Sequence, residues 1–273
     1  MAIKKSVKKK VKKNLSPFKD VALLEKEIVT YINKFKTTVH TQAKRMSDYF
    51  EMSCFNYIVR YYERNGYDVS IENLIAKRYR YKCSPSGIQS NFSFFKITKK
   101  IRGVEHIFEI QHNLAIQSSH DVEIFTNPDI AIIKYGTCHY TKSYYDSSRT
   151  FSFAQNKDLF SFFEVKHFNP FPELVFNFMG VVNELRKEIM DDIATNYTPK
   201  HLAPSLMVSG KPNKQTLKIK HSLENRYCIN IIYDMFYSGA STFSRNNMNN
   251  LRKAGSLNWF SPLSNHKFKV LRF

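Results

Sequence analysis

The sequence lacks the spacing patterns that mark zinc-binding and disulfide-rich proteins. Its four cysteines are scattered singly, and no two of them form a CxxC pair: Cys54, Cys83, Cys138 and Cys228. This spacing suggests neither a zinc ribbon nor a disulfide framework. The nine histidines show no HExxH or HxxxH spacing, so the sequence predicts no zinc site.

Long apolar runs are also missing. No stretch of 18 apolar residues is present, which is about the length a helix needs to cross a bilayer. The first residues, MAIKKSVKKKVKK, are positive, but no apolar segment of signal-peptide length follows them. We therefore expect a soluble, cytoplasmic protein without a membrane partner.

Acidic residues are scarce and are absent from both ends of the chain. The net charge is +19, from 42 Lys and Arg against 23 Asp and Glu. Seven lysines lie in residues 1–13 and six Lys or Arg follow Asp234, with no acid in either segment. Such a charge attracts polyanions, and nucleic acid is the commonest one inside cells. A Lys-rich end is also often only a solvated arm, so a specific role for residues 1–13 stays open.

The hydrophobic pattern predicts helices around a group of strands. Apolar residues recur at helical spacing over 18–45 and again from Ser47 to Gly66, whereas residues 68–133 are rich in strand-forming Ile, Phe and Val. Residues 170–191 predict a further helix, and two strand-like runs follow at 204–210 and 226–236. This order predicts an α/β domain with a mixed sheet flanked by helices.

Three segments are expected from this pattern. Residues 1–15 form a basic disordered arm, 16–236 form the α/β domain with an N-terminal helical extension, and 237–273 form a basic C-terminal extension.

The stretch SFFEVKHF places an acid and an amine on one face of an apolar strand. Side chains alternate along a strand, so Phe160, Phe162, Glu164 and Lys166 share a face that His167 does not. An ionised pair on a buried face is costly unless another group offsets it, although a surface pair near a strand end is the simpler explanation.

Asp129 gives the pair a chemical use. It follows Asn127-Pro128 and begins the apolar run DIAII. Two carboxylates at strand ends can hold a divalent metal through oxygen ligands, and an amine beside them can face a phosphate. Asp121 and Glu123, just upstream, could extend the acidic group, but a loop acid in water needs no special role.

Two further acids compete for a fourth position. Cys54, Phe55, Ile58 and Tyr62 lie three, four, seven and eleven residues after Glu51, which puts Glu51 on the buried face of its helix. The alternative is that Glu51 lies at the edge of the apolar stripe and that its carboxylate reaches water.

Glu109 is the rival acid, with Gln111 on the same strand face. The alternative to an active-site role is that Glu109 and Gln111 form a structural polar pair within the sheet.

These residues give the chain a resemblance to the PD-(D/E)XK nuclease superfamily. Pro128-Asp129 resembles the PD element and Glu164-Val165-Lys166 the ExK element, and the order of helices and strands is similar over about residues 40–236. The resemblance implies a restriction-endonuclease-like fold, a mixed β-sheet flanked by helices. Both basic ends lie outside it.

The resemblance also implies roles for individual residues. Asp129, Glu164 and the backbone carbonyl of Val165 would bind Mg²⁺, for which Mn²⁺ could substitute. Lys166 would orient or help deprotonate the attacking water and offset charge in the transition state. Glu51 would contact a second metal or a metal-bound water.

The function expected from this resemblance is that of a metal-dependent endonuclease that hydrolyses phosphodiester bonds, with double-stranded DNA as substrate. Roles in defence and in mobile-element DNA processing are typical of the family, and the resemblance therefore favours one of them. The alternatives are a catalytically inactive scaffold subunit of a nucleoprotein complex and an RNA-directed nuclease. A homodimer or a larger nucleoprotein complex is compatible with the sequence.

A tyrosine-rich stretch forms a second candidate contact with nucleic acid. Residues 134–149 interleave four tyrosines with basic residues, as a nucleic-acid contact loop does, although such connections are equally often packing surfaces. His167 should point away from Lys166 and have a structural role.

Overall fold

A computed structural model describes residues 46–145, 149–191, 197–235, 248 and 250–254. The expected basic arm over 1–15 and the helix over 18–45 lie outside these residues, as does most of the expected extension over 237–273. In the part of the chain that is described, no helix is long and apolar enough to cross a membrane.

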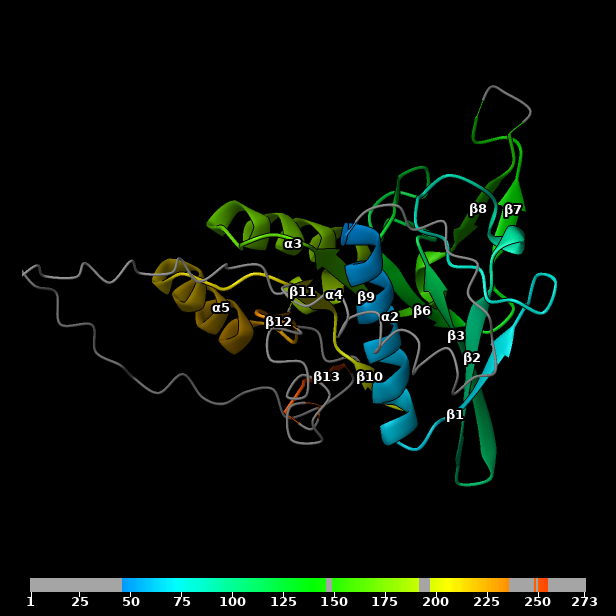
Figure 1. Cartoon of the computed structure of the whole chain (residues 1–273), viewed down its shortest axis with the longest axis horizontal. Helices are drawn as coiled ribbons and strands as arrows, with labels where there is room; N and C mark the ends of the chain where they lie inside the picture. The colour runs from blue at the N-terminus through cyan, green and yellow to red at the C-terminus, as the bar shows by residue number, and fades with distance from the viewer. Residues whose placement is uncertain (1–45, 146–148, 192–196, 236–247, 249, 255–273) are drawn as a thin grey trace, which may run out of the picture.

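A seven-stranded mixed sheet forms the centre of the described chain (Figure 1). The order across the sheet is β1-β2-β3-β6-β9-β11-β12. Its strands are β1 (Asp68–Glu72), β2 (Phe94–Ile101), β3 (Val104–His112), β6 (Ile130–Lys134), β9 (Leu159–Lys166), β11 (Ser205–Val208) and β12 (Asn230–Ile232). Neighbours from β1 to β9 are antiparallel, whereas β9, β11 and β12 run parallel. The predicted α/β class with a mixed sheet is confirmed.

The two strands that carry the PD and ExK elements lie side by side in the middle of this sheet. Ile130 pairs with Phe163 and Ala131 with Phe162. The first four residues of β6 are fully buried, which explains the continuous apolar run in the sequence. The PD and ExK elements therefore lie on adjacent, central strands.

Helices cover both faces of the sheet. Helix α2 (Met46–Arg64) packs on one face, in a core shared with Ile130, Ile132 and Val165. Helices α3 (Pro172–Leu185) and α5 (Lys214–Arg226) contribute to the core on the other face. Because α3 connects β9 to β11 and α5 connects β11 to β12, these helices are the crossovers that parallel strands require.

A smaller four-stranded sheet lies beside the main one, in the order β5-β4-β8-β7. Its strands are β4 (Ala115–Gln117), β5 (Phe125–Thr126), β7 (His139–Thr141) and β8 (Phe151–Ala154). Strands β7 and β8 project at the upper right in Figure 1. Strand β5 ends three residues before Asp129, so this sheet leads directly into the PD element.

The second half of the chain departs from the predicted elements. The helix expected to run to Asp191 ends at Leu185, and a short helix α4 (Lys187–Met190) follows. Between them, the buried Arg186 guanidinium donates to the carbonyls of Leu159 and Phe160, so its backbone leaves helical geometry to make these contacts.

Helix α5 was not predicted, and the strand expected over 226–236 is reduced to β12. Few apolar residues lie in α5, but Asn213 caps its first turn by accepting the N–H of Thr216 at 2.8 Å. Residues 253–254, from the expected C-terminal extension, form β13 (Lys253–Ala254), which pairs with β10 (His201–Leu202).

One prediction about the faces of β9 was wrong. The register of β9 against β6 shifts between Ile132 and Ile133, and this irregularity turns Phe160 to the face covered by α2. Phe160 therefore does not share a face with Phe162, which packs in the opposite core.

Candidate active site

Asp129 and Glu164 meet at the ammonium group of Lys166. The Nζ atom of Lys166 lies 2.9 Å from Oδ2 of Asp129 and 2.8 Å from Oε2 of Glu164. The Lys166 side chain is 31% exposed, against 17% for Asp129 and 13% for Glu164, so the group is recessed but open to solvent. The structure thus brings together the three residues of the PD and ExK elements.

Pro128 explains how the two strands separate at this point. The antiparallel register, continued one step past Asp129, places Val165 opposite Pro128. Proline has no N–H and cannot extend the hydrogen-bonded ladder. Instead, the backbone N–H of Val165 donates to Oδ2 of Asp129 at 2.6 Å. The carbonyl of Val165 faces the same way as its N–H, toward a position where no backbone donor exists.

Burial and mutual repulsion raise the pKa values of the two acids of this site. Burial, followed by the nearby charge of Asp129, raises the pKa of Glu164 to about 7. Burial also raises the pKa of Asp129, against the lowering effect of Lys166. Desolvation alone would lower the pKa of Lys166, but attraction to Asp129 and Glu164 outweighs it and the pKa is raised. Lys166 is therefore a firmly protonated donor beside two acids whose pKa values are raised.

Glu51 approaches the same site from helix α2. Its Oε1 accepts the side-chain N–H of Asn113 at 2.6 Å, and the backbone N–H of Asn113 donates to the carbonyl of Asp129 at 2.9 Å. The Nε2 of buried His112 is also 2.6 Å from Oε1 of Glu51, but this contact lacks hydrogen-bond alignment. The Glu51 carboxylate is thus tied to the backbone of Asp129 through one residue.

Asn113 and Lys82 were not recognised in the sequence. Asn113 has a φ of 50°, a left-handed conformation that asparagine tolerates better than most residues. Its carbonyl accepts the buried Lys82 ammonium at 2.8 Å, and Lys82 also donates to Oε1 of Gln89 at 3.0 Å. The contact between Lys82 and Asn113 joins residues 31 positions apart in the chain, so only the position of Asn113, directly after the strand β3, was a signal.

The other sequence candidates lie in different surroundings. Glu109 accepts the side-chain N–H of Gln111 at 2.7 Å and the backbone N–H of Gly136 at 2.8 Å, as a structural polar group would. His167 contacts Ser209, and its ring lies 5.7 Å from the tilted ring of Phe50 in α2, on the face away from Lys166 as expected.

Asp121 and Glu123 are exposed in the connection between β4 and β5. There, the backbone N–H of Glu123 donates to the Asp121 carboxylate at 2.8 Å.

The oxygen atoms of the site fit a hard divalent cation. Within the described ranges, no three His, Cys, Asp or Glu side chains form a metal-binding group. The donors are instead two carboxylates and one carbonyl. Oδ1 of Asp129 and Oε1 of Glu164 accept no hydrogen bond from any described residue, and the Val165 carbonyl has no donor opposite it on the Pro128 side. Oxygen donors of this kind, completed by water, suit Mg²⁺.

Searches against models of protein families, curated proteins and solved structures find no match to this chain. Its function therefore has to be inferred from the geometry and chemistry of the site.

Proposed function

We propose that this protein is a metal-dependent nuclease that hydrolyses phosphodiester bonds. The observation that carries the proposal is the meeting of Asp129, Glu164 and Lys166 at the point where β6 and β9 separate. Two acids that can hold a metal ion and one amine, recessed but reachable from solvent, can together support phosphodiester hydrolysis.

The order of elements around the site supports a restriction-endonuclease-like arrangement. Helix α2 precedes three antiparallel strands, β3, β6 and β9. Helix α3 then crosses to β11, which lies parallel to β9. The acids stand at the ends of the second and third of these strands, as the resemblance to PD-(D/E)XK nucleases implies.

Three oxygen-bearing groups would hold the metal: the carboxylates of Asp129 and Glu164 and the carbonyl of Val165. When bound, Mg²⁺ supplies Lewis-acid stabilisation and lowers the pKa of a coordinated water. The N–H of Val165 fixes the orientation of the Asp129 carboxylate at 2.6 Å, so one oxygen is held by the backbone while the other faces away from it.

Lys166 acts as a charged hydrogen-bond donor in this proposal. Its raised pKa keeps it protonated at neutral pH, so it does not serve as the general base. An ammonium beside the scissile phosphate stabilises the negative charge that develops in the transition state. The contacts of Lys166 with both acids also reduce their mutual repulsion before substrate arrives.

Glu51 has a supporting role. Its carboxylate is held by Asn113, whose backbone also contacts Asp129. From this position Glu51 orients a water near the two metal-binding acids, and its removal should harm cleavage less than the removal of Asp129 or Glu164.

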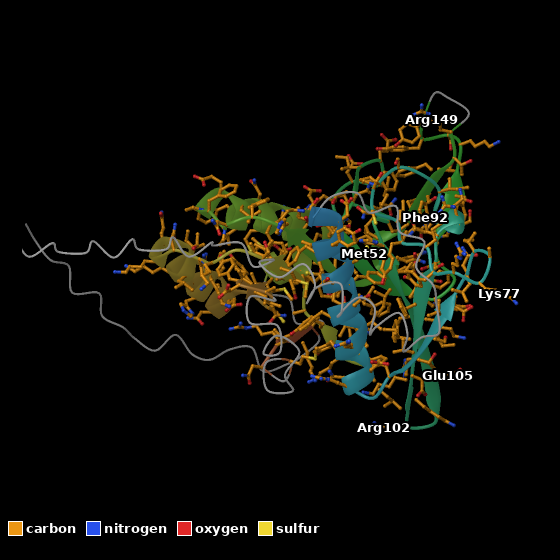
Figure 2. The ribbon with its side chains drawn as sticks, viewed as in Figure 1. Met52, Lys77, Phe92, Arg102, Glu105 and Arg149 are labelled. Atoms are coloured by element: carbon orange, nitrogen blue, oxygen red, sulfur yellow. The ribbon has the colours of Figure 1, made fainter. Side chains whose placement is uncertain are left out.

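Incubation with nucleic acid tests the proposal. Supercoiled plasmid DNA and an RNA transcript of matched length are incubated with Mg²⁺, with Mn²⁺ or with chelator. We expect cleavage only when a divalent ion is present, because the acids need it to stabilise the transition state. Glu105→Gln, an exposed acid on the distant β2–β3 hairpin, is the matched control for Glu164→Gln (Figure 2).

The positive charge of the chain favours nucleic acid as the substrate, and duplex DNA is the form that the resemblance suggests. Selective cleavage of the transcript would instead assign the RNA-directed alternative. Binding of both polymers without cleavage of either would assign the scaffold alternative. A role in defence or in mobile-element processing remains a proposal based on the family's habits.

A further inference from the structure

A cavity of about 330 Å³ lies next to the candidate active site. It is formed where the small sheet ends and β5 leads into Asn127, Pro128 and Asp129. The lining residues used below are Lys82, Ser86, Asn127, Tyr145, Arg149 and Phe151. Asn127 is two residues from Asp129, so their Cα atoms are at most about 7 Å apart. A ligand in the cavity is therefore a near neighbour of the metal-binding acids.

The described lining of this cavity carries positive charge and no carboxylate. Lys82 and Arg149 supply the cations, and the remaining polar groups are hydroxyls and an amide. A wall of this kind favours an anionic ligand, because none of its described residues is an acid that could neutralise either cation.

Lys82 is unusual because it is buried without an acid. It is 2% exposed, and its two hydrogen bonds go to neutral acceptors, the side chain of Gln89 and the carbonyl of Asn113. An ammonium has three N–H donors, so the described residues leave one of them for a ligand. Burial lowers the pKa of Lys82 to about 8, and a bound anion would raise this pKa again.

Aromatic rings form a stacking surface beside these cations. Tyr144 stacks on Phe151 at a centroid distance of 4.2 Å, and Phe151 lies nearly parallel to Phe153 at 5.8 Å. Tyr145 meets the edge of Phe151 at 5.7 Å and is 46% exposed. Rings fixed in this way offer a face on which a nucleic-acid base can stack.

The volume limits what can enter. Ligand pockets usually measure roughly 300–1000 Å³, so this cavity is at the small end of the range. It has room for one nucleotide and not for a base pair. A base in a duplex must leave the stack to reach such a cavity, whereas a base in a single strand is already free.

We propose that this cavity binds one unpaired nucleotide of the nucleic-acid substrate. The base stacks on the exposed ring of Tyr145, which Phe151 supports from the side, and the phosphate contacts Arg149 and Lys82. The next phosphodiester along the strand then lies at Asp129 and Glu164. This inference rests on the proposed function, since it assigns the cavity to the nuclease's own substrate, and it predicts a preference for single-stranded or unstacked sites.

The test measures binding in chelator, so that it does not depend on cleavage. The probes are a single-stranded DNA oligonucleotide, a single-stranded RNA of the same sequence and a fully paired duplex, each with one 2-aminopurine. We expect the single strands to bind more tightly than the duplex and to change the fluorescence of the probe base on binding.

Two surface variants alter the cavity without touching the core. Arg149→Ala removes an exposed cation, and Ser86→Trp fills the cavity from an exposed loop position. Each should weaken binding of the single strands about tenfold or more and abolish the fluorescence change. The control is Arg102→Asn, which removes the same charge at the opposite end of the view in Figure 2. Asparagine tolerates the φ of 50° found there.

The outcomes distinguish a failure of the cavity proposal from a failure of the proposed nuclease function. If both cavity variants bind all probes as the wild type does, or if the duplex binds as tightly as the single strands with no fluorescence change, the cavity proposal is overturned. If the variants lose binding while wild-type protein shows no metal-dependent cleavage, the cavity proposal stands and the proposed nuclease function is wrong.

Discussion

The backbone N–H of Val165 donates to Oδ2 of Asp129 at 2.6 Å, across the point where the pairing of β6 and β9 ends. Because the residue opposite Val165 is Pro128, no backbone N–H is present there to donate to the Val165 carbonyl. One proline thus leaves the carbonyl of Val165 available for a metal beside the Asp129 carboxylate.

Pro128→Ala tests this arrangement. Alanine restores an N–H opposite the Val165 carbonyl and extends the strand pairing by one step. The new hydrogen bond should be worth about 0.5–1.5 kcal/mol and should compete with the metal for the carbonyl. We expect the Mg²⁺ concentration for half-maximal cleavage to rise roughly two- to tenfold. Pro172→Ala, at the start of α3, is the control, and equal metal requirements for the two variants would contradict the assignment.

Lys166→Met should destabilise the protein as well as inactivate it. Without the ammonium, two recessed carboxylates face each other, which should lower the free energy of unfolding by about 1–3 kcal/mol. Adding Glu164→Gln should restore part of this loss, because only one of the two carboxylates then remains charged. Urea unfolding in chelator measures both effects. Lys187→Met, at an exposed position of α4, should change little. A double variant no more stable than Lys166→Met would contradict the electrostatic explanation.

The link from Glu51 through Asn113 to Asp129 predicts non-additive effects. Asn113→Gly keeps the left-handed backbone but removes the side chain that holds Glu51. Asn113→Gly and Glu51→Gln should each lower the cleavage rate about tenfold, and the double variant should be little worse than either alone. Single-turnover cleavage measures these rates. Multiplied effects in the double variant would show that Asn113 acts independently of Glu51.

His201 predicts how stability depends on pH. Burial lowers its pKa to about 3 from an ordinary value of 6.5, and the Nδ1 atom lies 3.2 Å from the hydroxyl of buried Tyr62. Between these two pH values the unfolded chain binds a proton that the folded one does not, so stability is lost as pH falls.

In His201→Phe this loss should be smaller by up to about 1.4 kcal/mol per pH unit. Urea unfolding between pH 6.5 and 4.5 measures the slope. His221→Gln, exposed on α5, should keep the wild-type slope. Parallel curves for wild type and His201→Phe would show that His201 is not the group responsible.

The sequence predicted the centre of the molecule better than its periphery. Strands β6 and β9 are continuous apolar runs, and the two acids stand at their ends, so their meeting followed from strand pairing alone. Helix α5 has few apolar residues and begins at a side-chain cap, which hydrophobic periodicity does not reveal. Lys82 and Asn113 came together only through contacts between distant segments. The turn of Phe160 to the other face required a register shift that no local pattern encodes.

Cleavage by the acid variants tests the central claim most directly. Wild type, Asp129→Asn, Glu164→Gln and the control Glu105→Gln are compared under single-turnover conditions with Mg²⁺, alongside nucleic-acid binding and thermal unfolding. The account predicts that the two site variants fold and bind as the wild type does but cleave at least about a hundredfold more slowly, while the control is unchanged. A folded wild type that binds DNA and RNA but cleaves neither with Mg²⁺ or Mn²⁺, or site variants that cleave at the wild-type rate, would contradict it.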